Sequence, residues 1–230
     1  MKRWLKYVSV FTLLFSSIFY WYLLDGRLTN GAEFEIDITQ LRQLANSVAG
    51  EKPSEIQVEK VAQFYFFSTL AMAGSGFKTL PMGVYVFRLR SPEGDIIIDS
   101  GYDQAMATAS HADFFVPAYE RTQQALSQAN KIVITHGHKD HIGGILRHKN
   151  LAEILPKVML SKEQLDVPES IRPRFPQGVL ESYKPLRYEN YHALQADVVL
   201  IKTPGHTPGS QMIYVQLQTN EEFLFLGDVA

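Results

Sequence analysis

The apolar and charged positions of the chain divide it near residue 24. Residues 7–24 carry no charge over 18 positions, with Arg3 and Lys6 before them and Asp25 directly after them. As a helix this run would span roughly 27 Å, close to the ~30 Å hydrocarbon core of a bilayer. Three consecutive aromatic residues, Tyr20 to Tyr22, lie at its far end, where amphipathic rings favour the membrane interface.

Basic residues before an apolar run favour a cytoplasmic N-terminus. The pattern therefore predicts a signal anchor, a single transmembrane helix over residues 1–24, with the C-terminal domain outside the cytoplasm, in a periplasmic or equivalent space. Two alternatives stay open from the same residues. One is a protein secreted after cleavage of a signal peptide, and the other is a buried core helix.

Beyond this run, short apolar segments alternate with helical patterns. Helical spacing over residues 38–48 predicts a helix that Asp37 or Thr39 caps and that Gly50 ends. A second helix is expected over residues 119–129. The predicted strands are 56–61, 84–89, 95–99, 131–135, 158–160, 198–201 and 223–226. The turn at 91–94 makes a hairpin of two of them, so the mixture of hairpins and crossovers predicts an α/β fold with a mixed sheet.

Composition narrows the class of protein. Hydrophobic residues make up 46% of the chain and aromatic residues 12%, which excludes a disordered protein. The net charge of −2 and the lack of a long basic run disfavour nucleic-acid binding. Because the chain has no cysteine, disulfides, thiolate nucleophiles and cysteine-ligated zinc are excluded.

A cluster of potential metal ligands follows the strand predicted at 131–135. His136, His138, Asp140 and His141 lie within six residues. Burying three imidazoles and a carboxylate together is costly without a cation, because each needs a polar partner. Imidazole and carboxylate are ligands that suit Zn²⁺ or Fe²⁺. The segment therefore predicts a metal site.

Two later motifs also place a potential ligand after a strand. His206 lies in the Pro- and Gly-rich loop 203–210, and Asp228 follows the strand predicted at 223–226. Loops at the carboxyl ends of strands converge in layered α/β folds, so these side chains are expected near the histidine cluster. The remaining histidines have no motif around them and are expected at the surface: His111, His148 and His192. Tyr102 and the aromatic run 64–67 are expected in the core, with a position lining the substrate cleft as the alternative for either.

With these motifs the sequence resembles the metallo-β-lactamase superfamily over residues 84–228. The resemblance is carried, in family order, by the strand ending at Asp99, the signature 136–141, Gly205-His206 and Gly227-Asp228. It implies a four-layer αββα sandwich with a dinuclear site, expected to hold Zn²⁺, with Fe²⁺ or Mn²⁺ as alternatives. By resemblance the first metal is held by His136, His138 and His206, the second by Asp140 and His141, with Asp228 bridging the two. Asp99 would orient the histidine loop without binding metal.

One departure from the family bears on the domain organisation. The family supplies a final histidine some tens of residues after the bridging aspartate, whereas this sequence ends at Ala230. We expect a truncated version of a longer protein, or alternatively a natural short form with an incomplete second site. The predicted organisation is an anchor (1–24), a helical lead-in (25–55) and an incomplete metallo-β-lactamase-like domain (56–230).

The resemblance implies a metal-dependent hydrolase that uses a metal-bound hydroxide on an ester, lactone, thioester, amide or related bond of a small-molecule substrate, with Asp140 steering the proton. Its expected partners are that substrate and, through the first helix, a membrane, with no nucleic acid. A non-catalytic or weakly active membrane-tethered metal-binding remnant is one alternative. An iron-dependent dioxygenase-like relative is another, because two histidines and a carboxylate also suit Fe²⁺.

Overall fold

The structure, a computed structural model, describes residues 2–26, 35–166 and 174–228. The chain forms two compact units. Unit 1 consists of Met1–Glu35 and Phe64–Met82, and unit 2 consists of Ile36–Gln63 and Gly83–Ala230. The chain passes from one unit to the other at three places: between residues 35 and 36, 63 and 64, and 82 and 83. The last two of these places lie within two long strands.

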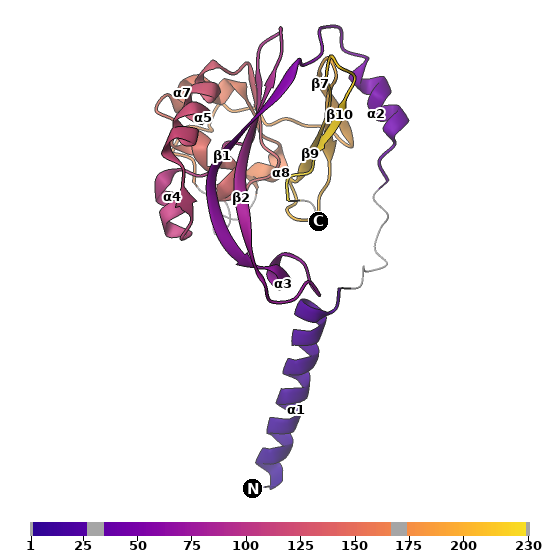
Figure 1. The fold of residues 1–230 in the computed structure, drawn as a ribbon, viewed down its shortest axis with the longest axis vertical. Helices are drawn as coiled ribbons and strands as arrows, with labels where there is room; N and C mark the ends of the chain where they lie inside the picture. Colours follow the sequence, from indigo (N-terminus) through magenta and orange to yellow (C-terminus); the bar gives the residue numbers. More distant parts are fainter. Residues whose placement is uncertain (1, 27–34, 167–173, 229–230) are drawn as a thin grey trace. The chain divides into compact units, whose positions relative to one another are not determined.

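A mixed six-stranded sheet forms one half of unit 2 (Figure 1). Its strands are β1 (Glu55–Phe67), β2 (Thr79–Arg90), β3 (Ile96–Ile98), β4 (Asp113–Phe114), β5 (Lys131–Val133) and β6 (Val158–Met159). Their order is β4-β1-β2-β3-β5-β6, with β2 and β3 antiparallel and β3, β5 and β6 parallel. The predicted mixed sheet and the predicted hairpin around residues 91–94 are both confirmed.

The second sheet of unit 2 has four antiparallel strands in the order β10-β9-β8-β7. They are β7 (Tyr191–Gln195), β8 (Val198–Lys202), β9 (Gln211–Gln216) and β10 (Glu222–Phe225). The sequence predicted β8 and β10 but neither β7 nor β9. β7 is interrupted by His192 and ends at Gln195, so it is not an uninterrupted apolar run. β9 does contain an apolar run, Met212 to Val215 between two glutamines, and this signal was overlooked.

The two sheets face each other across an apolar core. Leu89, Ile98 and Val133 of the six-stranded sheet pack with Leu200 and Ile213 of the four-stranded sheet, and all five are fully buried. Alternate residues of each strand point into this core, because successive side chains of a strand lie on opposite faces. Removal of this apolar surface from water is the main force that holds the sheets together.

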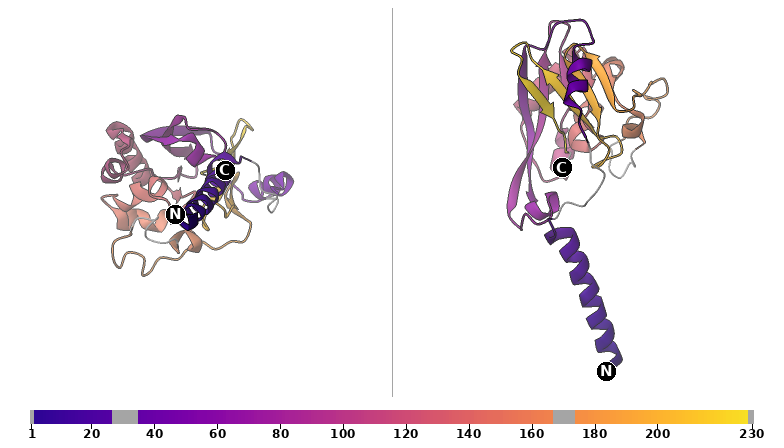
Figure 2. Two further views of the ribbon diagram at one scale, coloured as in Figure 1. Left: turned by 90° about the horizontal axis from the view of Figure 1, so that it is seen from below. Right: turned by 90° about the vertical axis from the view of Figure 1, so that its right-hand side faces the viewer.

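Helices cover the outer faces of both sheets (Figure 2). On the four-stranded sheet, Leu41 and Ala45 of α2 (Ile38–Ala45) pack against Val199 and Tyr214. Asp37 caps α2 by accepting hydrogen bonds from two backbone N–H groups, as predicted for one of two candidate residues. The other helices of unit 2 are α4 (Gln104–Ala109), α5 (Val116–Gln128), α6 (Lys139–Leu146), α7 (Leu151–Ile154), η2 (Leu155–Lys157) and α8 (Lys162–Leu165). Those labelled α4, α5 and α7 lie beyond the six-stranded sheet in Figure 1, and α5 confirms the helix predicted at 119–129.

Unit 1 contains the apolar N-terminal helix α1 (Lys2–Phe19), the π-helical segment η1 (Tyr20–Leu24) and the short helix α3 (Ser68–Ala71). Arg3–Leu24 is long and apolar enough to cross a membrane, and none of its apolar window is buried; a signal sequence has the same features. The hydroxyls of Ser9 and Thr12 donate to carbonyls of their own helix, so these polar groups are satisfied without water.

The predicted core position of the aromatic run 64–67 is wrong for three of its four residues, while Phe64 is half-buried. Tyr65, Phe66 and Phe67 are 59%, 38% and 54% exposed. They lie in unit 1, whereas the residues of the inter-sheet core all come from unit 2. An aromatic run inside a strand therefore did not reveal whether that part of the strand faces a second layer.

Candidate metal centre

Three imidazoles lie close together, two from the segment after β5 and one from a loop that is distant in the sequence. His136 and His138 lie between β5 and α6, and the Nε2 atom of His136 is 3.0 Å from Nδ1 of His138. The Nε2 atom of His206 approaches the same Nδ1 atom at 3.0 Å. Nitrogens at this separation match donors that share one Zn²⁺, because Zn–N bonds are about 2.0–2.1 Å.

The loop 203–210 holds His206 through its own hydrogen bonds. The N–H of Thr203 donates to the carbonyl of Ser210 at 2.9 Å, and the N–H of Thr207 donates to the Ser210 hydroxyl at 2.9 Å. The N–H of Gln211 donates to the carbonyl of Thr135 at 2.9 Å, which ties this loop to the residue before His136. A backbone hydrogen bond thus links the two histidine segments.

Asp228 lies between two groups of donors. Its Oδ2 atom is 3.6 Å from Nε2 of His206 and 3.8 Å from Nε2 of His136, while its Oδ1 atom is 3.4 Å from Nε2 of His141. Gly227 before it has a φ of 59°, and a Cβ there would lie 2.9 Å from Cβ of Thr135. Only glycine combines this left-handed backbone with so close an approach.

Two overlapping groups of potential ligands result within the described residues. One contains His136, His138, His206 and Asp228, and the other contains Asp140, His141 and Asp228, with the ligand atoms of each group within 4.8 Å of one another. All six predicted metal ligands are therefore brought together by the fold. Nitrogen and carboxylate oxygen donors in these numbers fit a pair of Zn²⁺ or similar divalent ions.

The buried carboxylate of Asp99 supports this cluster from behind. Its Oδ2 atom is 2.8 Å from Nδ1 of His141, and its Oδ1 atom accepts the N–H of Thr135 at 2.7 Å. Asp99 has a φ of 62°, which turns the chain sharply after β3. A carboxylate on the far nitrogen of a histidine fixes the ring and leaves Nε2 pointing toward the ligand group.

Sequence reasoning missed two residues that position the signature. The hydroxyl of Thr135 lies 2.9 Å from Oδ2 of Asp99 and 3.2 Å from Nδ1 of both His136 and His141. The hydroxyl of Ser100 donates to the carbonyl of His141 at 2.8 Å. Each of the two could have been found in the sequence, because each is a polar residue shortly after a buried strand and next to a residue of the ligand motifs.

Burial and charge set the protonation of the cluster. Burial, and then the neighbouring His141, lowers the pKa of His136; burial and then His206 lowers the pKa of His138. Both imidazoles are therefore neutral near pH 7, with a lone pair available for a metal. Burial also opposes a charged His141, but Asp99 and Asp228 outweigh it and raise the pKa of His141.

The three histidines without a motif differ in their surroundings. His111 is exposed, as predicted, and His192 is half-buried in β7. The predicted surface position of His148 is wrong, since only 5% of it is exposed. Its Nδ1 atom accepts the N–H of Asn150 at 3.1 Å, and its Nε2 atom lies 2.9 Å from the hydroxyl of Ser127. Local hydrogen bonds thus satisfy a buried histidine that has no motif. Tyr102 is buried, as predicted.

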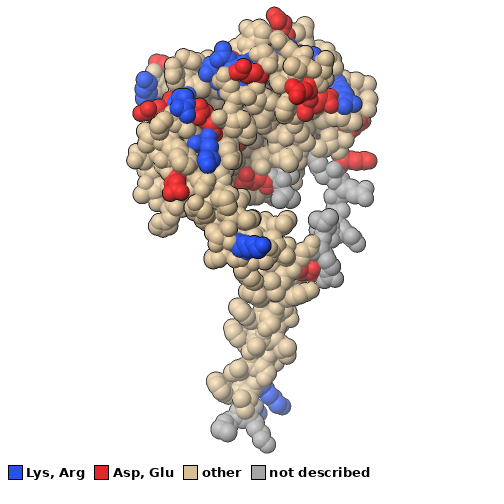
Figure 3. Space-filling model, in the orientation of Figure 1, with Lys and Arg blue, Asp and Glu red and all other residues tan. Residues whose placement is uncertain are grey.

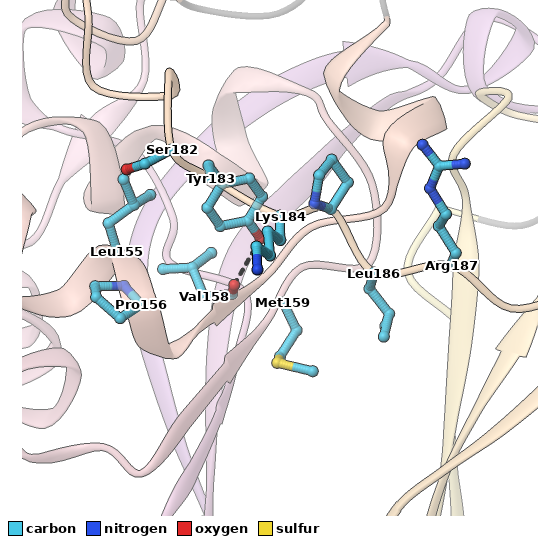
Figure 4. A pocket seen from close by; sticks show the side chains of 10 residues that line it. Leu155, Pro156, Val158, Met159, Ser182, Tyr183, Lys184, Leu186 and Arg187 are labelled. Carbon is cyan, nitrogen blue, oxygen red and sulfur yellow. Dashed lines mark hydrogen bonds between the residues drawn. The ribbon is translucent and has the colours of Figure 1, made fainter.

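A separate cavity of about 460 Å³ lies beside β6 (Figure 4). Val158 and Met159 line it together with Tyr183 and Leu186, and the Tyr183 hydroxyl donates to the carbonyl of Val158 at 2.7 Å. None of the candidate metal ligands lines this cavity. It is therefore distinct from the candidate metal centre.

Comparison with known proteins identifies the family. The profile described as "Metallo-beta-lactamase superfamily" matches residues 80–230, and the chain belongs to this superfamily of metal-dependent hydrolases. One curated relative is a "Beta-lactamase-like protein 2 homolog" of Drosophila melanogaster, which is 29% identical over 64% of this chain and 46% of the relative. Another is an "N-acyl homoserine lactonase" of Bacillus sp., which is 21% identical over 66% of this chain and 65% of the relative. The chain spans about half the length of the first two curated relatives that it matches.

Solved structures agree on the fold. A quorum-quenching N-acyl homoserine lactone lactonase superposes with a TM-score of 0.61 at 18% identity, covering 76% of this chain and 74% of the other. An N-acyl homoserine lactone hydrolase with N-hexanoyl-L-homoserine at its catalytic metal center gives 0.60 at 17% identity, covering 75% and 74%. The similarity to these lactonases extends over three quarters of each chain.

Proposed function

We propose that this protein hydrolyses carboxylic esters, lactones foremost, at a centre of two metal ions, with zinc as the expected metal. The observation that carries the proposal is the position of Asp228, whose two carboxylate oxygens face different donor groups. When bound, such ions supply an activated water and polarise the substrate carbonyl.

The side chains of this protein have separate roles in the proposal. His136, His138 and His206 would hold one ion, and Asp99 would orient His141 toward the other. Asp140 would help to hold that other ion, and its carboxylate would accept and return a proton during the reaction. His206 and Asp228 are 34% and 43% exposed in their side chains, which leaves the cluster open to a small molecule from solvent.

Lactones are the favoured substrates within this class for two reasons. A curated relative is named as an N-acyl homoserine lactonase, and a structurally similar hydrolase holds a ring-opened N-acyl homoserine. The chemistry needs no serine or cysteine nucleophile, in keeping with the cysteine-free sequence.

The test is turnover by the full chain in detergent with added Zn²⁺, on N-acyl homoserine lactones, aryl esters, a thioester and a β-lactam. We expect lactone hydrolysis, and a loss of at least a hundredfold in Asp228→Asn and His206→Ala. His192→Ala is the matched control and should retain activity. Firm metal binding without turnover of any substrate would favour the metal-binding remnant, and iron-dependent oxygen uptake would favour a dioxygenase; either result overturns the proposal.

We also propose that α1 anchors the protein in a membrane, with unit 2 outside the cytoplasm. The support is the basic N-terminal end of the apolar span Arg3–Leu24 and its aromatic far end. A reporter that is fluorescent only in the cytoplasm, fused after Ala230, should remain dark, and the protein should sediment with membranes at its full mass. Fluorescence would contradict the orientation, and a shortened soluble product would indicate signal cleavage instead.

A further inference from the structure

The end of β1 and the start of β2 form an apolar hairpin in unit 1. We name residues 64–82 the hairpin tip; α3 lies within it, between the two strand ends. Lys78 is the one charged residue among these positions of the sequence. Several large apolar side chains of the tip are more than half exposed to solvent: Phe67, Leu70, Met72 and Phe77. Unburied apolar groups at this density mark a contact surface.

The hairpin tip is bonded to the far end of the apolar N-terminal helix. The N–H of Gly74 donates to the carbonyl of Leu23 at 3.0 Å, and the hydroxyl of Thr69 donates to the same carbonyl. The rings of Phe19 and Phe77 are stacked, with centroids 6.4 Å apart and planes at 18°. The last carbonyls of a helix have no partner within it, and here the tip supplies donors for one of them.

The tip has its own internal structure. The N–H of Ser68 donates to the carbonyl of Lys78 at 2.8 Å, and the Ser68 hydroxyl donates to the carbonyl of Gly76 at 2.5 Å. The exposed apolar side chains are therefore presented by a folded turn. Their exposure does not result from an open strand end.

We propose that the hairpin tip lies in the interfacial layer of the bilayer that α1 crosses, as a second membrane contact; this inference rests on the proposed anchoring by α1. The span ends at Tyr20, Trp21 and Tyr22, aromatic residues of the kind that gather at the headgroup level. Because the tip is bonded to Leu23, its own aromatic side chains occupy the same depth. The rings of Phe67 and Phe77 are then transferred out of water, to the apolar side of the headgroups.

Charge also favours a lipid surface over a protein partner. The surface of α1 is nearly bare of charged side chains between its ends, while acidic and basic side chains are mixed over unit 2 (Figure 3). The single charge of the tip, Lys78, is carried on a long apolar stem, which lets its ammonium group reach the headgroups. A protein–protein interface normally surrounds its apolar centre with a polar rim, whereas Lys78 is the one charged residue of the tip sequence.

The cysteine-free sequence allows a direct test. Leu70→Cys in the tip, Leu14→Cys in α1 and Thr219→Cys on the exposed surface of unit 2 are each labelled with a polarity-sensitive fluorophore. The full chain is reconstituted into vesicles of phosphatidylcholine and phosphatidylglycerol that carry quenchers at shallow or deep acyl positions. We expect the Leu70 probe to shift to shorter wavelength and to be quenched at least twofold more by shallow than by deep quenchers. The Leu14 probe should respond to deep quenchers, and the Thr219 probe to neither.

The outcomes separate the two proposals. A Leu70 probe that behaves like the Thr219 probe, while the Leu14 probe is quenched, overturns the second contact and leaves the anchor. A Leu14 probe that behaves like the Thr219 probe overturns both. A Leu70 signal that depends on protein concentration at constant lipid, and not on quencher depth, would show copies of the chain meeting at the tip and would also overturn the inference.

Discussion

The carboxylate of Asp99 lies 2.8 Å from Nδ1 of His141, 42 positions away along the chain. This contact occupies the nitrogen that faces the protein interior, so that Nε2 of His141 faces Asp140 and Asp228. Because the imidazole cannot turn without losing the contact, Asp99 sets the direction of a candidate ligand without being one.

Replacing the carboxylate of Asp99 should weaken binding of the second metal ion. We expect Asp99→Asn to lower affinity at the site of Asp140 and His141 by about 10–100-fold, the usual effect of losing such a partner. Asparagine tolerates the left-handed backbone at this position, so the fold should be retained. Isothermal titration with Zn²⁺ measures the change, and exposed Asp166→Asn is the control. Unaltered affinity would refute the orienting role.

The two donor groups should differ in metal affinity. The first offers three imidazoles and a carboxylate, whereas the second, within the described residues, offers three ligands of which Asp228 is shared. We expect about one equivalent of Zn²⁺ to survive dialysis and a second equivalent to bind only in excess metal. Hydrolysis should rise as the second site fills. Native mass spectrometry provides the count. Two retained equivalents would show that the second group is complete.

Acid should remove the contribution of one surface ion pair to stability. Hydrogen bonds from Arg42 and then Tyr214 lower the pKa of Glu222 from 4.5 to about 2. A depressed carboxyl pKa stabilises the fold above the unfolded value, and this gain is lost as the pH falls from about 4.5 to 2. The side chain of Arg42 is 54% exposed, so solvent screening keeps the effect small.

Urea unfolding in EDTA checks this expectation. The wild type should be more stable than Glu222→Gln at pH 6, and the difference should shrink at pH 3 and vanish near pH 2. Exposed Glu221→Gln serves as the comparison and should follow the wild type. A difference that grows toward acid would reverse the assigned sign.

The inter-sheet core should carry much of the stability of unit 2. Leu200 is fully buried between the sheets, and Leu200→Ala should lower the free energy of unfolding by about 2–5 kcal/mol through lost contacts and a residual cavity. Val58→Ala, on a side chain that is 54% exposed, should change it by less than about 1 kcal/mol. Equal effects of the two substitutions would contradict the assigned core.

The sequence alone determined the chemistry of the candidate site and the class of the fold. Three imidazoles and a carboxylate within residues 136–141 are informative because their residue types and spacing are local properties of the chain. The strands 96–98 and 198–202 were predictable for the same reason, since an apolar run between turns needs a buried position. Gly227 and Asp228 were recognisable by their place after a strand.

The meeting of His206 with His138 was expected only from the strand-end argument and the family resemblance, and the contact itself is a property of the tertiary structure. His206 contacts His138 across 68 positions because two separate sheets bring their strand ends to one edge, and no local pattern encodes that distance. The same reason accounts for the two errors of burial. Whether Phe66 and Phe67 face solvent, and whether His148 is enclosed beside Ser127, depends on which layer packs over each segment. Burial is set by the partner surface, and the partner is chosen by the fold as a whole.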